Sequence, residues 1–112
     1  MKKIKILLLL ATATLIFSCD STTYQDIQPV VTNPTFVANI APVVSAKCAG
    51  CHAGGNQYPN LETYDEVKDA CINGNVTCRI DASCGRIMPQ DGKMSQAIID
   101  QIKLWTANGC PN

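Results

Sequence analysis

The stretch Cys48-Ala49-Gly50-Cys51-His52 places two thiols three positions apart and an imidazole directly after the second thiol. In a helical turn, residues three apart lie on the same side, so both thiols can face one flat ligand. C-x-x-C-H is the attachment pattern of a c-type haem, in which each thiol bonds one vinyl carbon as a thioether. The sequence therefore predicts one covalent haem c, bound by Cys48 and Cys51, with His52 as an axial iron ligand.

Other uses of the C-x-x-C spacing are redox dithiols, zinc sites and plain disulfides. A thioredoxin-like site would need a βαβ pattern, which this sequence does not show. A zinc site would need a second pair of ligands at short spacing. The chain has one histidine, and Cys71, Cys78 and Cys84 follow one another at intervals of seven and six residues. These observations favour haem.

The length of 112 residues allows one domain at most. Without residues 1–18, six Lys and Arg remain against nine Asp and Glu, so the mature chain is acidic, with a net charge near −3. No basic patch remains that would indicate nucleic acid as a partner. The chain has few aromatic residues for a core, and a domain of this size usually needs disulfides, a metal or a cofactor. A buried haem would supply much of the apolar interior.

The N-terminus resembles a bacterial lipoprotein signal. A lysine-rich start precedes an apolar run over residues 6–17, which is too short to span a bilayer well. Ile16-Phe17-Ser18-Cys19 then has an aliphatic residue at −3, a small residue at −1 and a cysteine at +1, although Phe17 departs from the usual small residue at −2. We predict a signal peptide over 1–18 and lipidation of Cys19. An ordinary secretory signal is the alternative, and the domain is exported in either case.

Residues 19–34 are polar and contain prolines, which predicts a flexible tether between the lipid and a domain at 35–112. The domain would then lie in the periplasm or at the cell surface, anchored to a bacterial membrane by Cys19. Helical periodicity begins near Phe36, and this first helix is expected to present both haem cysteines from its final turn. Pro42 places the start of that helix near residue 39 or else bends it.

Two further helices are expected, which makes the fold class all-α. Thr63 and Glu66 have the spacing of a capping box, with Thr63 as the N-cap of a helix that ends near residues 73–75. Ser95 is a good N-cap for a last helix, whose apolar face includes Trp105. We expect Trp105 to pack against the first helix or the haem edge.

A second axial ligand is expected between the middle and last helices, and methionine is the usual partner of histidine. Met88 is followed by a proline that stiffens the backbone, whereas Met94 directly precedes a helix cap. We therefore expect Met88 as the sixth ligand, with Met94 as the second choice and a five-coordinate iron as the alternative. Arg79 and Arg86 could pair with haem propionates.

Seven cysteines are an odd number for an exported protein. Assigning one to lipid and two to haem leaves four, which can form two disulfides in an oxidising compartment. Three pairings are possible, and sequence cannot choose among them. Cys78–Cys84 with Cys71–Cys110 is the arrangement that we favour.

Taken together, these parts resemble the class I cytochrome c fold, and in particular the small haem domains of exported bacterial lipoproteins. The resemblance covers about residues 35–112. The matching positions are Ile40, Pro42, Val43, Cys48, Cys51, His52, Leu61, Tyr64, Val67, Met88, Pro89, Ile99, Ile102, Trp105 and Gly109. It implies thioether bonds at Cys48 and Cys51, proximal ligation by His52 and distal ligation by Met88. The four additional cysteines lie outside the family pattern.

The function expected from these features is electron transfer by a monohaem cytochrome, which is not an enzyme. Its partners would be redox proteins, and the acidic surface favours a basic partner. A haem sensor or peroxidatic domain with an open iron site is a second hypothesis. A third is a lipoprotein without haem, stapled by disulfides, that acts as a binding or adhesion module.

Overall fold

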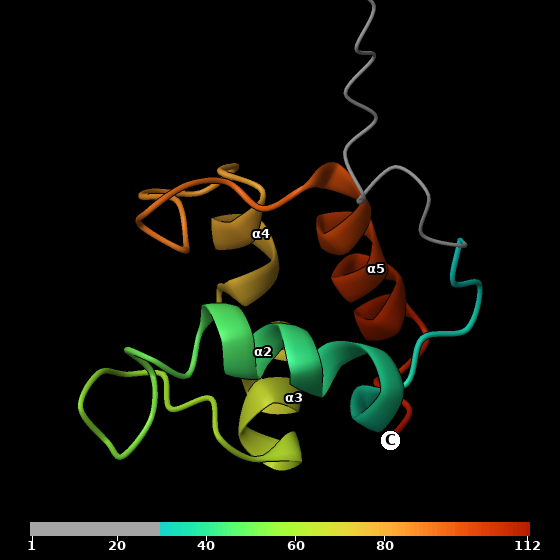
Figure 1. The fold of residues 1–112 in the computed structure, drawn as a ribbon, viewed down its shortest axis with the longest axis horizontal. Coiled ribbons are helices and arrows are strands. Elements are labelled where there is room, and N and C mark those ends of the chain that lie inside the picture. Colours follow the sequence, from blue (N-terminus) through green and yellow to red (C-terminus); the bar gives the residue numbers. More distant parts are fainter. Residues whose placement is uncertain (1–29) are drawn as a thin grey trace, which may run out of the picture.

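The computed structural model describes residues 30–112, so the predicted signal peptide, Cys19 and residues 19–29 of the predicted tether lie outside the described residues. Within 30–112 the chain forms helices and no strand, which confirms the all-α class (Figure 1). The helical segments are η1 (Phe36–Ile40), α2 (Ala41–Lys47), α3 (Tyr64–Ile72), α4 (Val76–Ile80) and α5 (Gln96–Ala107). None of these described helices has the length and apolarity needed to cross a membrane.

The first helix is built in two parts that join at a proline. Thr35 is the N-cap, and its Oγ1 accepts a hydrogen bond from the backbone N–H of Ala38 at 3.4 Å. A π-helical turn, η1, follows and leads directly into α2, which carries Pro42 in its first turn. Pro42 has no N–H to donate to the preceding turn, so the change in helix type falls where that bond is missing. The helix therefore continues through this region with a change of geometry.

The capping box predicted for α3 is confirmed. Thr63 Oγ1 accepts from the backbone N–H of Glu66 at 3.4 Å, and Glu66 Oε2 accepts from the backbone N–H of Thr63 at 2.9 Å. Asn60 Nδ2 donates to the other oxygen of Glu66 at 2.7 Å. These bonds lower the pKa of Glu66 from its usual 4.5 to about 2, the bond from Asn60 contributing most. The carboxylate of Glu66 thus joins the start of α3 to the loop before it.

We expect Glu66→Gln to flatten the acid side of the stability profile. Because the folded-state pKa of Glu66 lies below the unfolded value, its contribution to stability is present above about pH 4.5 and is lost as pH falls toward about 2. Urea unfolding measured in steps between pH 7 and pH 2.5 should show a shallower decline for the variant than for the wild type. Asp65→Asn, one residue away and on the exposed surface, is the matched control. Equal slopes for the wild type and Glu66→Gln would contradict the expectation.

The residues between α3 and α5 contain one helix that periodicity does not predict. α4 has five residues, too few for an apolar pattern to repeat. Ser95 occupies the N-cap position of α5 as predicted, but its side chain makes no capping hydrogen bond, and its buried Oγ has no partner among the described residues. The prediction of Ser95 as the N-cap residue is therefore confirmed, but the capping hydrogen bond that such a residue usually makes is not formed.

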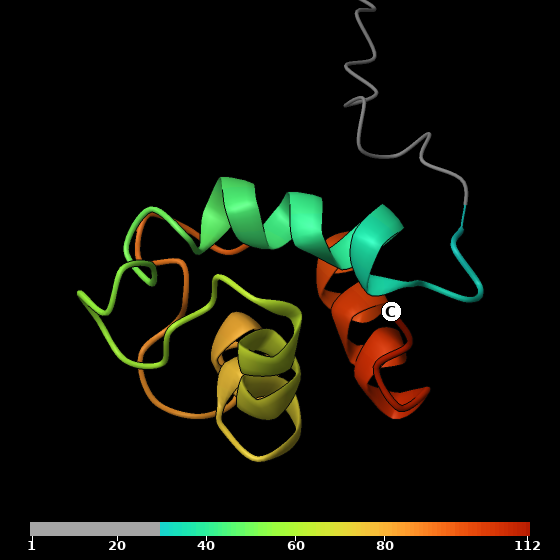
Figure 2. The same cartoon turned by 90° about the horizontal axis from the view of Figure 1, so that it is seen from below.

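The core forms where three aromatic rings from different helices meet. Trp105 of α5 is fully buried, and its ring lies 6.0 Å from that of Phe36 in η1 and 6.5 Å from that of Tyr64 in α3, measured between centroids. This confirms that Trp105 packs against the first helix. The C-terminal residues join the same cluster, because the carbonyl of Pro111 accepts from Trp105 Nε1 and from the N–H of Phe36, both at 2.8 Å. The C-terminus accordingly lies beside η1 (Figure 2).

Two loops extend from this core at the end of the molecule opposite the C-terminus. One follows α2 and the other precedes α5, and both views place them at that same end (Figures 1 and 2). The first loop contains the C-x-x-C-H stretch and the second contains Met88. The fold therefore brings the predicted haem residues to one region.

Candidate haem site

The C-x-x-C-H stretch forms a turn directly after α2. The helix ends at Lys47, and Cys48 is its C-cap. The carbonyl of Cys48 accepts from the N–H of Cys51 at 3.1 Å and from the N–H of His52 at 2.9 Å. The expectation that the final helical turn carries both cysteines is therefore wrong by one turn, since Cys51 lies past the end of the helix. The hydrogen-bonded turn nevertheless fixes the spacing between the two thiols.

The two thiols differ in their surroundings. Cys48 is half-buried and packs against the apolar core, whereas Cys51 is exposed, and both are free. Burial raises the pKa of the Cys48 thiol, so this group stays protonated at neutral pH.

His52 is oriented by a backbone carbonyl. Its Nδ1 lies 2.8 Å from the carbonyl oxygen of Pro59. Because a carbonyl only accepts hydrogen bonds, Nδ1 carries a proton and donates, and in the neutral ring the lone pair is then on Nε2. Histidines that ligate metals typically donate their other ring N–H to a carbonyl or a carboxylate in this way. His52 therefore has the tautomer and the restraint of a metal ligand.

The loop that carries Pro59 is itself held in place. The N–H of Leu61 donates to the carbonyl of His52 at 2.7 Å, and the N–H of Gly54 donates to Glu62 Oε2 at 2.9 Å. Asn60 then connects this loop to Glu66 in the capping box of α3. Asn60 Nδ2 also donates to Glu62 Oε2 at 2.9 Å, and this bond, followed by the bond from Gly54, holds the pKa of Glu62 below its usual value. The orientation of His52 thus depends on the start of α3.

Met88 and Met94 lie in different environments. Met88 is half-buried in the loop before α5, and its N–H donates to the carbonyl of Arg79 at 3.1 Å. Met94 is buried, with 8% of its surface exposed, and belongs to the hydrophobic core. Met94 therefore contributes to core packing, and the choice of Met88 as the axial ligand stays a prediction.

The end of α2 and the Met88 loop face each other across a cavity of about 190 Å³. Its lining consists of Lys47, Pro89, Asp91, Gly92, Lys93 and Met94. Lys47 directly precedes Cys48, and Pro89 directly follows Met88. Met94 lines this cavity, whereas Cys48, Cys51, His52 and Met88 do not.

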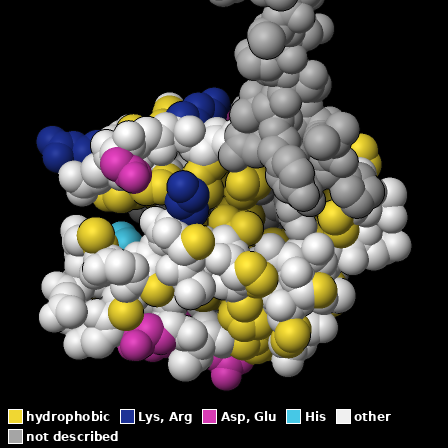
Figure 3. Space-filling view, viewed as in Figure 1, with side chains coloured by type: hydrophobic (Ala, Val, Ile, Leu, Met, Phe, Trp, Pro, Cys, Tyr) yellow, Lys and Arg dark blue, Asp and Glu magenta, His cyan; other side chains and the backbone are white. Residues whose placement is uncertain are grey.

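The space-filling view shows a hollow at the end where the two loops lie, with the single histidine in it (Figure 3). Gly50 has open space where a Cβ would be, and Ala53 and Gly54 follow the histidine. Small residues let a flat macrocycle approach the backbone closely. The oriented imidazole and the two free thiols are the side chains that a covalently bound haem would need.

Two other observations bear on alternative sites. A cavity of about 560 Å³ lies between residues 30–31, η1 and α5, and neither the C-x-x-C-H residues nor Met88 line it. Its lining has no histidine or cysteine, so it has no chemistry that would bind iron. Among residues 30–112, no three His, Cys, Asp or Glu side chains come together as a site for a bare metal ion.

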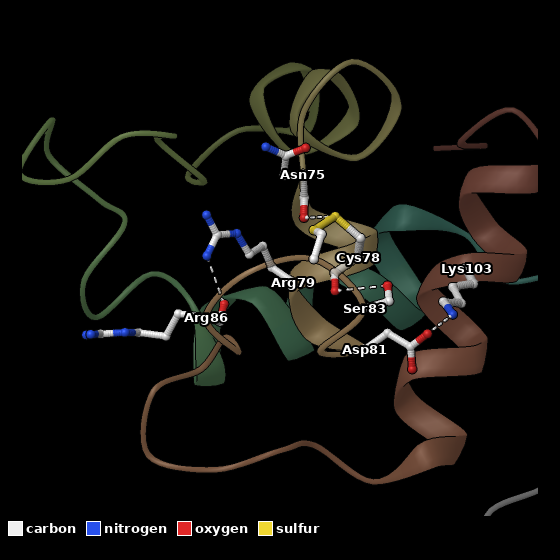
Figure 4. The surroundings of a disulfide bond; sticks show 8 residues. Asn75, Cys78, Arg79, Asp81, Ser83, Arg86 and Lys103 are labelled. Atoms are coloured by element: carbon white, nitrogen blue, oxygen red, sulfur yellow. Dashed lines mark hydrogen bonds and ion pairs between the residues drawn. A yellow bond between two sulfur atoms is a disulfide. The ribbon is translucent and has the colours of Figure 1, made fainter.

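The four remaining cysteines form one bond in place of two. Cys78 in α4 and Cys84 in the following loop are joined, with their Cα atoms 5.3 Å apart, which confirms the predicted pair (Figure 4). Cys71 and Cys110 are free and buried, so the predicted second disulfide is not formed. Burial raises the pKa of Cys71 to about 12, and neighbouring Cys110 adds to the rise. Since the thiolate is the reactive form, this environment keeps the pair unreactive.

Arg79 and Arg86, the two predicted partners of the haem propionates, differ in their contacts within the protein. Arg79 Nη1 donates to the backbone carbonyl of Arg86 at 3.0 Å, while the Arg86 side chain is exposed (Figure 4). Arg79 therefore has a partner within the protein already, which leaves fewer of its donors for a propionate. Sequence reasoning missed this contact and the one at Pro59, because backbone carbonyls as acceptors leave no signature in residue type.

Comparison with protein-family models, curated proteins and solved structures finds no match to this chain. The interpretation of the site therefore rests on its own residues and geometry.

Proposed function

We propose that this chain is a monohaem c-type cytochrome that transfers single electrons at or outside the cell envelope. The observation that carries the proposal is the hydrogen bond from His52 Nδ1 to the carbonyl of Pro59. It leaves Nε2 free on the residue that directly follows the two thiols, as haem ligation requires.

Each residue has a distinct role in this proposal. Cys48 and Cys51 would each add their S–H across one vinyl group, with sulfur bonding one carbon and hydrogen the other. His52 would supply the proximal nitrogen and Met88 the distal sulfur. When bound, the iron supplies one-electron chemistry by cycling between its ferrous and ferric states. With both axial positions taken by side chains, a substrate would have no open position, which favours a carrier over an enzyme.

Location and partners follow from the same proposal. Haem attachment and the Cys78–Cys84 disulfide both suit an exported protein, and Cys19 would anchor it to the membrane through lipid. The domain would exchange electrons with redox proteins that approach the exposed part of the haem. Asp65 and Asp69 are exposed on α3 and would favour a partner with basic groups.

The decisive experiment is the intact mass of the protein exported from a bacterium that attaches haem to proteins. We expect the mass of the processed chain plus one haem, together with a visible absorption spectrum. The double variant Cys48→Ser/Cys51→Ser is the matched control and should lack the added mass, because no thioether can form. Colourless wild-type protein without extra covalent mass would contradict the proposal.

A further inference from the structure

We propose that Arg79 is a positioning residue that holds the Met88 segment in place for ligation; this rests on the proposed function above. Arg79 contacts the segment twice, from the backbone and from the side chain, and Figure 4 shows the side-chain bond to Arg86. Its carbonyl accepts the N–H of Met88 at 3.1 Å, and its Nη1 donates to the carbonyl of Arg86 at 3.0 Å. These two bonds fix the backbone at Met88 itself and two residues before it.

The loop is shaped around the guanidinium group. Gly85 has a φ of +66°, a conformation that side chains other than glycine rarely adopt. A Cβ built at Gly85 would lie 2.8 Å from Arg79 Nη1 and 3.0 Å from its Cζ. The absence of a side chain at position 85 therefore leaves the room that the Arg79 side chain occupies on its way to Arg86.

Arg79 is well placed for this role because its own backbone is anchored. The disulfide at Cys78 closes the residues after α4 into a small ring, and the N–H of Ser83 donates to the carbonyl of Cys78 at 2.9 Å. Asp81, just past α4, forms ion pairs with Lys103 of α5 and, at 3.8 Å, with Lys93 (Figure 4). The disulfide and the ion pair with α5 therefore fix the end of α4. From this fixed position Arg79 can hold the more exposed segment around Met88.

Arginine suits this position better than lysine would. Its guanidinium presents several N–H donors in a rigid plane, so a bond to a fixed carbonyl loses less conformational freedom. A charged donor also makes a stronger hydrogen bond than a neutral one. A thioether is a weak ligand for iron. Greater mobility of the Met88 backbone should therefore reduce the fraction of molecules in which Met88 ligates the iron.

The test compares Arg79→Met and Arg79→Lys with Arg86→Ala in the exported full-length protein. Arg86→Ala removes a guanidinium from the same loop but keeps the carbonyl that Arg79 binds, so it controls for charge. Three quantities should be measured: the methionine–iron charge-transfer band, the midpoint potential, and amide exchange at Met88. Far-UV circular dichroism verifies that each variant folds.

We expect Arg79→Met to weaken the band, lower the potential and speed exchange at the Met88 N–H by about tenfold, the scale of one lost charge-assisted bond. Arg79→Lys should restore part of each change, and Arg86→Ala should leave the exchange rate at the Met88 N–H unchanged. An unchanged band, potential and exchange rate in folded Arg79→Met would overturn the inference. Wild-type protein lacking covalent haem would instead overturn the proposed function and the ligand role with it, while exchange at Met88 would still decide whether Arg79 orders the segment.

Discussion

Met88→Ala should abolish the methionine–iron charge-transfer band of the oxidised protein and lower its midpoint potential. A thioether ligand favours the reduced iron, so its loss should move the potential by a substantial part of the range of about 0.8 V that axial ligands span. Because Met88 is half-buried in a loop, its removal should have little effect on folding. Absorption spectroscopy and a redox titration measure the first effect, and urea unfolding measures the second.

Met94→Ala is the matched control and should give the opposite result. Met94 lies in the hydrophobic core with 8% of its surface exposed. Truncating a buried methionine typically destabilises a protein by about 2–5 kcal/mol, since it leaves a cavity. The band should persist in this variant at temperatures where it stays folded. A band that survives Met88→Ala and disappears in folded Met94→Ala would exchange the roles of the two residues.

Rapid binding of carbon monoxide to reduced wild-type protein would favour an open iron site.

Features encoded over a few residues could be predicted from the sequence. The capping box at Thr63 and Glu66 is a local exchange of hydrogen bonds, so its spacing alone identifies the start of α3. The Cys78–Cys84 bond spans six residues and closes within one turn and loop. In both cases the partners are close along the chain, and little of the remaining fold is needed to bring them together.

Features that depend on distant parts of the chain could not be predicted in the same way. Cys71 and Cys110 are 39 residues apart, and their pairing is predicted only because it would tie the middle helix to the C-terminus. The structure buries both as free thiols in the core. The contacts that orient the candidate site go to the carbonyls of Pro59 and Arg86, and every residue type has such a carbonyl. The sequence therefore predicts the candidate haem residues but not the backbone groups that hold them.

Trp105→Ala should be the most destabilising single substitution in the core. The indole is fully buried against Phe36 and Tyr64, and its Nε1 bonds the carbonyl of Pro111. Truncating a buried tryptophan to alanine typically lowers the free energy of unfolding by about 3–5 kcal/mol. In a domain of this size each kcal/mol corresponds to a shift in Tm of about 4–8 °C, so Tm should fall by more than roughly 10 °C. Thermal and urea unfolding followed by circular dichroism would measure the loss.

Trp105→Phe separates packing from hydrogen bonding at the same position. The variant keeps a ring against Phe36 but loses the Nε1 donor. The carbonyl of Pro111 still accepts from the N–H of Phe36 at 2.8 Å, so it is not left without a partner. We therefore expect a smaller loss, of about 1–2 kcal/mol, for one missing bond and a reduced ring. If Trp105→Ala were no less stable than Trp105→Phe, the aromatic cluster would not be what joins η1, α3 and α5, and the position of the C-x-x-C-H turn at the end of α2 would depend on other contacts.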